Sequence, residues 1–148
     1  MMNDDLQIPE GLDDLEDTTH LVYICSAHTG NPMEVELFDR FYCNFAAEAE
    51  EETPVAPYLI FPQFFNEKLK VDKIISRNCA LKLLSKCDEL WVMQGGGITA
   101  EMADEIKFAM THGIPIRYRV LEFTDVEPDD VALKQLGVPN PVDAEVHE

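Results

Sequence analysis

The 148-residue chain is predicted to fold as one small α/β domain with a doubly wound parallel sheet of about four to five strands and flanking helices. Three observations predict this class. Short apolar runs are typical of buried strands, segments of helical periodicity lie between them, and glycine or proline marks the junctions. Ligands of such folds bind outside the carboxyl ends of the strands, so a functional site is expected at that edge.

The first half supplies two strands and one helix. Residues 20–27 (HLVYICSA) form a continuous apolar run, typical of a strand buried on both faces. From Pro32, a favoured first-turn residue, helical periodicity extends over 32–52, and acids at its far end oppose the helix dipole, so that end is expected to fray. Residues 53–65 contain three prolines and predict a short strand followed by a long loop. The residues expected on one face of the helix are Val35, Phe38, Phe41, Tyr42 and Phe45.

The second half alternates in the same way. Gly113 is expected to end the third helix of the chain. No internal repeat or second domain is visible. The expected elements are a helix over 71–86, a strand over 88–94, a helix over 99–112, a strand over 114–120 and a short helix over 126–137.

The net charge of −18 is concentrated at the two ends of the chain. Residues 1–19 hold seven acids and no base, and residues 122–148 hold eight acids and one lysine, which leaves 14 acids and 10 bases for residues 20–121. We therefore expect an acidic flexible N-terminal tail, a folded domain over 20–121 and an acidic C-terminal extension. Such a chain repels nucleic acid, although mimicry of nucleic acid by the acidic surface is an open alternative.

Several classes of protein are disfavoured by the sequence. The N-terminus lacks the features of a signal peptide, and no apolar run approaches the roughly 18 residues needed to span a bilayer. The cysteines form no CxxC pair and the histidines have no zinc-binding spacing, so we expect reduced thiols, no metal and a cytoplasmic protein without membrane partners. Neither a P-loop nor a GxGxxG motif is present, and no cofactor is expected.

The segment QGGGITAEMADEI (94–106) is the main candidate for a functional site. Glycines between a strand and a helix permit close backbone approach, and free amides at the helix start suit an anion, but a plain tight turn explains them equally well. Glu105 lies at the margin of the apolar face of the following helix, where a cleft would expose it. Glu101 and Glu105 are like-charged neighbours one turn apart, and the alternative is that both extend into water.

The end of the first strand offers a second group of candidates. Tyr23 lies within the strand, and Ser26, His28, Thr29 and Gly30 follow it. Two interpretations are open, because Tyr23 is also compatible with a plain core residue and His28 with an exposed loop histidine.

Four blocks of sequence carry a resemblance to a known family. VYICSAHTGNPMEVELFDRFY is followed by APYLIFPQFF, LLSKCDELWVM and GITAEMADEIKFAMTHGIPIRYR, which together cover about residues 20–120. They resemble the nucleoside 2-deoxyribosyltransferase-like superfamily, most nearly a small branch common in bacteria and their phages. The superfamily also contains 2′-deoxynucleoside 5′-phosphate N-hydrolases. The resemblance implies a flavodoxin-like fold and a homo-oligomer, a dimer or higher.

The resemblance also implies a mechanism and a set of site residues. A helix-borne Glu, here Glu105 in EIKFA, attacks the anomeric carbon and forms a covalent glycosyl-enzyme, which water or a second base resolves. The tyrosine that borders it corresponds to Tyr23, so these two are the expected catalytic residues. The expected ligand-binding residues are Ser26, His28, Gly30, Gly96, Gly97, Ile98, Thr99, Glu101 and Met102.

The chain departs from the family pattern at the position of an important acid. Relatives place an Asp in the loop before the helix or late in the preceding helix, where this chain has Gly96 and Ala80. Two main hypotheses follow. The first is an N-glycosidic hydrolase or transferase acting on a (deoxy)nucleoside or nucleotide, and the second is a non-catalytic binder of a nucleotide-derived ligand, such as a phage protein that captures a nucleotide signal. A structural or protein-interaction role is a third alternative.

Overall fold

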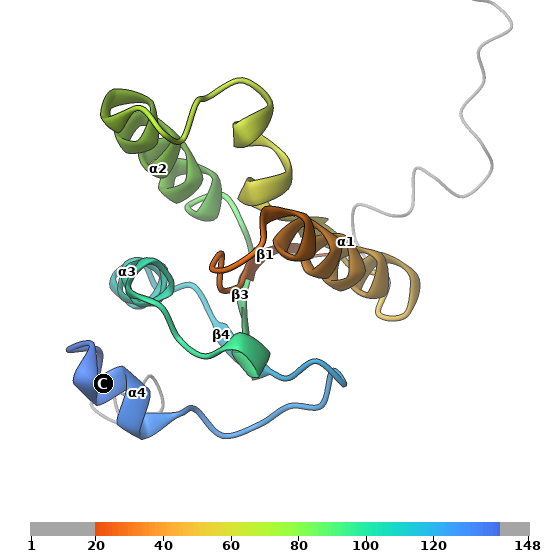
Figure 1. Ribbon diagram of the computed structural model, residues 1–148. Coiled ribbons are helices and arrows are strands. Elements are labelled where there is room, and N and C mark those ends of the chain that lie inside the picture. Colours follow the sequence, from red (N-terminus) through yellow and green to blue (C-terminus); the bar gives the residue numbers. More distant parts are fainter. Residues whose placement is uncertain (1–19, 140–148) are drawn as a thin grey trace, which may run out of the picture.

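The computed structural model describes residues 20–139, which form a four-stranded parallel sheet with flanking helices (Figure 1). The strand order is β2-β1-β3-β4, and every neighbouring pair is parallel. The predicted doubly wound α/β class is therefore confirmed. The strands are β1 (Leu21–Cys25), β2 (Thr53–Val55), β3 (Glu89–Met93) and β4 (Ile116–Arg119).

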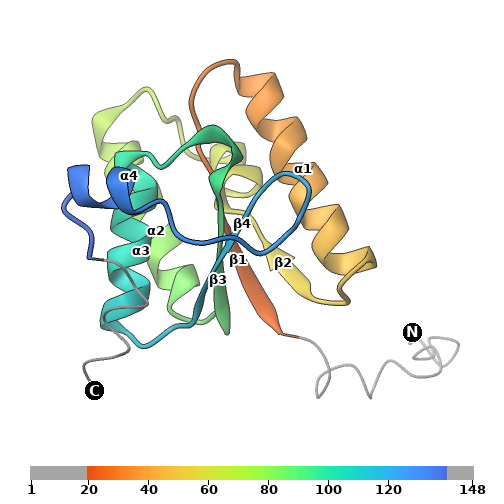
Figure 2. The same ribbon diagram turned by 90° about the horizontal axis from the view of Figure 1, so that it is seen from below.

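Helices cover both faces of the sheet (Figure 2). Helix α1 lies on one face, and α2, α3 and α4 lie on the other, as expected when the chain winds in both directions from β1. Three short 3₁₀ turns, η2 (Pro57–Leu59), η3 (Phe61–Gln63) and η4 (Gln94–Gly96), follow β2 and β3. The helices are α1 (Pro32–Glu48), α2 (Lys70–Leu84), α3 (Ala100–Thr111) and α4 (Asp130–Gln135).

The two central strands are buried on both faces, as their continuous apolar sequences predict. Alternate side chains enter two separate core layers, because successive residues of a strand point to opposite faces. Tyr23 and Leu90 pack with α2 and α3, whereas Ile24 and Trp91 pack on the side of α1. This alternation places the hydroxyl of Tyr23 on the same side of the sheet as α3.

The predicted buried face of α1 is partly wrong. Phe38 and Phe41 are each 47% exposed. The buried stripe is shifted around the helix and consists of Val35, Asp39, Tyr42 and Ala46. A buried carboxylate in mid-helix is costly unless it is paired, so Asp39 points to a polar site beneath α1.

The chain after β4 returns to the core. Phe123 is 8% exposed, and Leu133 and Val138 are almost fully buried against the layer that contains α2 and α3. The expected short helix is confirmed as α4. The domain boundaries remain predictions, and the expected N-terminal tail at 1–19 and the last residues from 140 lie outside the described part of the chain.

The carboxyl edge of the sheet is where β1 and β3 diverge into α1 and α3, and it is the switch point at which ligands of such folds bind. The opposite edge is closed by structural contacts. Asp88, at the start of β3, accepts a hydrogen bond from the backbone N–H of Leu21 at 2.8 Å. This contact gives Asp88 a structural role at the edge away from the site.

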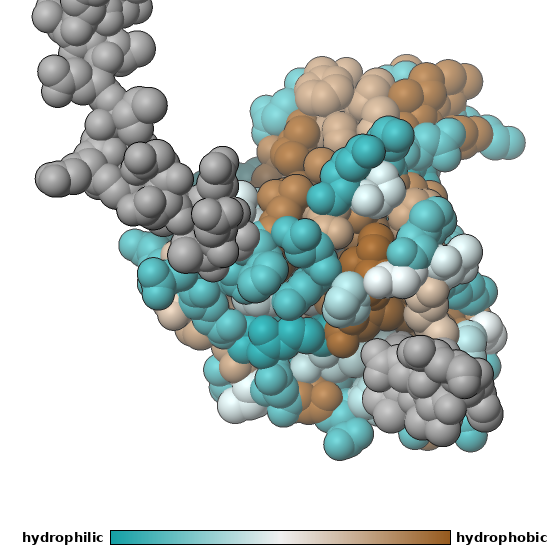
Figure 3. Space-filling model, turned by 180° about the vertical axis from the view of Figure 1, so that it is seen from behind, coloured by the Kyte–Doolittle hydropathy of each residue, from teal (hydrophilic) through white to brown (hydrophobic). Residues whose placement is uncertain are grey.

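Apolar side chains are exposed along α2 and the segment before it. Figure 3 shows hydrophobic residues gathered over this part of the surface. The helix predicted over 71–86 is confirmed as α2. It buries Ser76, Ala80 and Leu84, whereas Ile74 and Ile75 remain accessible. The exposed apolar residues of this surface are Ile60, Phe64, Leu69, Val71, Ile74 and Ile75.

Candidate functional site

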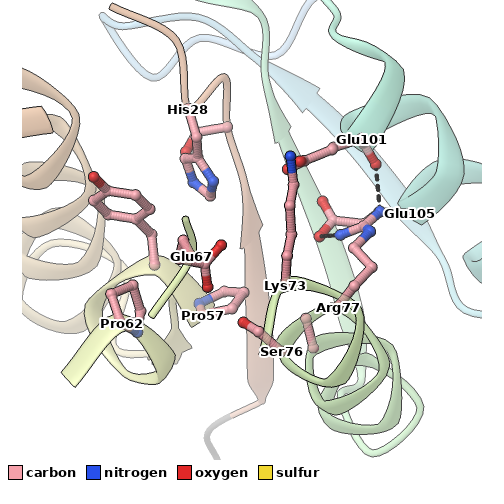
Figure 4. Close-up of a pocket in the computed structure, with 12 residues that line it drawn as sticks. His28, Pro57, Pro62, Glu67, Lys73, Ser76, Arg77, Glu101 and Glu105 are labelled. Carbon is pink, nitrogen blue, oxygen red and sulfur yellow. Dashed lines mark hydrogen bonds and ion pairs between the residues drawn. The ribbon is translucent and has the colours of Figure 1, made fainter. Parts of the chain in front are cut away.

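A cavity opens above the carboxyl end of β1, on the side of the sheet that carries α2 and α3 (Figure 4). Its walls come from the loops that follow β1 and β2 and from the facing sides of α2 and α3. Ser26 and His28 line one side, Arg77 lies on α2, and Glu101 and Glu105 lie on α3. The enclosed volume is about 50 Å³, which holds a few water molecules.

Glu105 is the central carboxylate of this cavity and is 5% exposed. The hydroxyl of Tyr23 donates a hydrogen bond of 2.5 Å to its Oε2 atom. Burial, followed by the nearby charge of Glu105, raises the pKa of Tyr23 well above its usual value, so the phenol keeps its proton and remains a donor. The two predicted catalytic side chains are therefore brought together by β1 and α3, 82 residues apart in the chain.

Arg77 is the second partner of Glu105. Its Nη1 atom lies 3.0 Å from Oε2 of Glu105, and its Nη2 donates to the backbone carbonyl of Glu101 at 2.7 Å. Burial lowers the pKa of Arg77, but the carboxylate of Glu105 outweighs this effect and the net pKa is raised, so the guanidinium stays charged. The ion pair compensates the charge of the buried carboxylate and covers it from the side of α2.

The ion pair between Arg77 and Glu105 leads to a prediction about the free energy of unfolding. Arg77→Met leaves a buried carboxylate with Tyr23 as its remaining partner and is expected to lower the free energy of unfolding by about 1–3 kcal/mol. Adding Glu105→Gln removes the charge and is expected to recover most of that loss. Urea titrations of the wild type, both single variants and the double variant measure the coupling. Additive single effects would contradict a direct charge interaction.

A second polar cluster joins α1 to the loop after β1. Ser26 Oγ donates a hydrogen bond of 2.5 Å to Oδ1 of Asp39, and Nε2 of His28 lies 3.2 Å from Oδ2 of the same carboxylate. Asp39 is 1% exposed. The His28 ring also packs on Tyr58, with ring centroids 4.7 Å apart. The loop histidine is therefore held in place on both sides.

The contact between His28 and Asp39 predicts a pH-dependent stability. Burial lowers the pKa of His28, but the nearby carboxylate of Asp39 outweighs this effect, so the pKa is raised above 6.5. A group whose pKa is raised in the folded state contributes its full stabilisation below its unfolded-state pKa. That contribution is lost as the pH rises through the folded-state pKa. The free energy of unfolding of wild type minus that of His28→Gln is expected to shrink as the pH rises from below 6.5 through the raised folded-state pKa of His28. A difference that is constant with pH would contradict this pairing.

The glycine loop shapes the region between the two central strands. Gly97 has φ +86°, which favours glycine, and a Cβ on Gly96 would lie 3.3 Å from the Cβ of Ala27. Gly96 lines a different cavity of about 480 Å³ on the side of α1, together with Ser26, Phe38 and other residues. This loop therefore borders the cavity on the side of α1 and packs closely against the loop after β1.

The other predicted ligand-binding residues have varied surroundings. Thr99 is the N-cap of α3 and accepts a hydrogen bond from the backbone N–H of Met102, whose side chain is 1% exposed in the core. Ile98 packs against the same core layer, and Gly30 has φ +88°. Gly30, Gly97, Ile98, Thr99 and Met102 line neither of the two cavities, and their roles in binding remain predictions.

Sequence reasoning missed Asp39, Arg77 and Tyr58. An acid within the apolar run LFDRFY was the available signal for Asp39, because its position matches the spacing of Val35 and Tyr42. Arg77 gives no comparable signal, since its partner is 28 residues away and on another helix.

Three further properties characterise the described part of the chain. Within residues 20–139, no cluster of three or more His, Cys, Asp or Glu side chains is arranged to hold a metal ion. None of the described helices is both long enough and apolar enough to cross a membrane. All four cysteines are free thiols.

The fold and the site define an α/β protein with a buried, paired carboxylate at the carboxyl edge of a parallel sheet. The chain belongs to the family described as Domain of unknown function (DUF7768), whose model matches residues 20–119. Among curated proteins, none matches the sequence.

A solved structure shares this fold. It is the 2-deoxyribosyltransferase from the psychrotolerant bacterium Bacillus psychrosaccharolyticus, which matches with a TM-score of 0.57 over 86% of this chain and 92% of that chain. The sequences are 10% identical, so the likeness concerns the fold. It confirms the predicted fold-level relation to a deoxyribosyltransferase.

Proposed function

We propose that the protein cleaves or transfers the N-glycosidic bond of a (deoxy)nucleoside or nucleotide, with Glu105 as the nucleophile. The observation that carries the proposal is the buried hydrogen bond from Tyr23 to Glu105 in a cavity at the carboxyl edge of the sheet. The fold that the protein shares with a 2-deoxyribosyltransferase supports glycosyl transfer as the reaction of this carboxylate. The placement of the protein in the small bacterial and phage branch of that superfamily is part of the same proposal.

The proposed reaction has two steps. Oε2 of Glu105 already accepts hydrogen bonds from Tyr23 and Arg77, so Oε1 is the oxygen that attacks the anomeric carbon. The bond to the base breaks and a glycosyl ester forms on Glu105. Water or a second base then attacks the same carbon and releases the carboxylate, which retains the configuration of the sugar.

A nucleoside is larger than this open cavity of about 50 Å³, so part of it extends out of the opening or the space beside Glu105 widens. The side chain of Arg77 is 24% exposed and reaches the cavity from α2. Because it is long and flexible, we propose that Arg77 moves away from Glu105 when the substrate enters. Lys73 lines the same wall one turn earlier and supplies a second cation at the mouth of the cavity.

The test is a panel of nucleosides and their 5′-monophosphates incubated with the purified protein and analysed for free base by chromatography. Base release from at least one member supports the proposal. The proposal would be overturned if a protein with a normal melting curve released no base from any ribo- or deoxyribonucleoside or nucleotide.

A second candidate function is non-catalytic binding of a nucleotide-derived ligand. The position of Arg77 favours a binding role, because a guanidinium that pairs with Glu105 also neutralises the charge of the proposed nucleophile. The apolar Ala80 stands in the cavity wall where relatives carry an acid. A binder should show a ligand-dependent rise in melting temperature and return the ligand unchanged, whereas an enzyme should return free base and sugar.

The proposal includes a homo-oligomer. The exposed apolar surface on α2 and the segment before it, which includes Val71 and Ile74, supports it (Figure 3). Light scattering during size-exclusion chromatography measures the assembly state directly, and a monomer at micromolar concentration would contradict it. A cytoplasmic location and a lack of nucleic-acid partners remain predictions from composition.

A further inference from the structure

The inference below rests on the proposed function, cleavage of a glycosidic bond by Glu105. Such cleavage needs a proton donor for the departing base. Without one, the electron pair of the broken bond stays on the base as a negative charge. The donor has to face the base from across the cavity. Glu101 is on the same helix as Glu105 and one turn from it, so it approaches from the side of the nucleophile.

His28 is on the opposite wall. Figure 4 shows its imidazole directed into the cavity from the loop after β1, across from the carboxylate of Glu105. Its side chain is 21% exposed, so one part of the ring is reachable while the other part is covered. The covered nitrogen, Nε2, faces Asp39 at 3.2 Å, which leaves Nδ1 as the nitrogen available to a ligand.

Asp39 holds this ring from beneath. Its carboxylate is almost fully buried and has one oxygen committed to Ser26 and the other to His28. The order of contacts is Ser–Asp–His, whereas in a nucleophilic serine triad the histidine lies between the serine and the acid. Ser26 therefore orients the carboxylate and is not activated as a nucleophile.

The electrostatic surroundings favour a protonated ring. The carboxylates of Asp39, Glu101 and Glu105 raise the pKa of His28 against the effect of burial. Glu67 also lines the cavity, and the cations that line it are Lys73 and Arg77 on α2. With the neighbouring Tyr58 on the other side of the ring, His28 carries a proton at neutral pH more readily than a free histidine does.

We propose that His28 is the proton donor to the leaving base and that Asp39 is the residue that positions it. As Glu105 bonds to the anomeric carbon, the carbon–nitrogen bond breaks and its electron pair passes to the base, which takes the proton from Nδ1 of His28. In the second step water adds to the anomeric carbon, Glu105 leaves as a carboxylate, and the proton from water returns to His28.

The test uses leaving groups that differ in their need for a proton. Guanosine and 2′-deoxyguanosine, with their 5′-monophosphates, need protonation of the base, whereas their 7-methylated forms already carry a positive charge and release a neutral base. Wild type, His28→Gln and Asp39→Asn are assayed on both sets by chromatography. His112→Gln is the matched control, because His112 is an exposed residue at the end of α3 that contacts the carbonyl of Phe108.

His28→Gln is expected to lower base release from the unmethylated set by about 10²–10⁴-fold, and from the methylated set by less than about tenfold. The wild-type rate on unmethylated substrates should fall as pH rises through the pKa of His28, and in Asp39→Asn this fall should move to lower pH. Rates on the methylated set should lack this fall. Melting curves verify that each variant is folded.

Equal loss on both sets by a folded His28→Gln, or no loss on either, would overturn the role of His28 while leaving Glu105 in place. An unchanged pH profile in Asp39→Asn would overturn the positioning role of Asp39. If wild type releases no base from either set or from any member of the panel of nucleosides and 5′-monophosphates, the proposed function itself fails and the inference fails with it. The two failures are therefore distinguishable.

Discussion

Glu105→Gln is expected to abolish base release, with a loss on the order of 10⁴-fold or more in kcat. A glutamine keeps the shape of the side chain and still accepts hydrogen bonds from Tyr23 and Arg77, but its amide cannot form the glycosyl ester. The fold should be retained, because the substitution also removes a buried charge. Chromatographic assay of the variant beside wild type measures the effect.

Asp104→Asn is the matched control for this experiment. It changes a neighbouring carboxylate on the same helix, and its side chain is exposed and lies outside the cavity. We expect its rate to stay within about threefold of wild type, since surface substitutions away from such sites have small effects. Glu105→Gln with near-wild-type activity would show that another group attacks the sugar.

Trp91→Ala is expected to have the largest effect on stability. Trp91 is fully buried at the centre of the sheet, and the guanidinium carbon of Arg119 lies 4.4 Å from the centre of its ring. Removing the indole leaves a large cavity in the layer beneath α1 and costs about 3–5 kcal/mol. Since the free energy of unfolding of a small domain is about 5–15 kcal/mol, the substitution removes much of it.

Urea unfolding followed by circular dichroism measures this effect, because the single tryptophan is removed by the substitution. Leu37→Ala serves as the control. Leu37 is on α1 and 61% exposed, so its truncation should cost about 0.5 kcal/mol or less. Equal costs for the two variants would mean that Trp91 is not a core residue of the folded protein.

The sequence predicted the fold well because its strands are encoded locally. Residues 21–25 and 90–93 are unbroken apolar runs, and a parallel sheet covered on both faces buries such runs fully. The glycines after β3 likewise mark the start of α3 with the N-cap Thr99. These signals depend on neighbouring residues, which the sequence displays directly.

The site was only half predictable for the opposite reason. Glu105 and Tyr23 were found, but Asp39 was not, because the expected apolar face of α1 included Phe38 and Phe41, which the structure leaves half exposed. Arg77 lies on α2, and the predicted helical periodicity of that segment does not show which of its polar residues face α3. Both residues owe their position to tertiary packing that brings α1, α2 and α3 to one edge of the sheet.

The central claim is that Glu105 forms a covalent bond to the sugar, and trapping that ester tests it most directly. A 2′-fluoro analogue of a cleaved nucleoside slows the oxocarbenium-like steps, so the intermediate accumulates. Acid quenching and mass spectrometry should then show one fluorinated sugar on the peptide that contains Glu105, and no adduct in Glu105→Gln. Base release without any adduct, or an adduct on another peptide, would contradict the account.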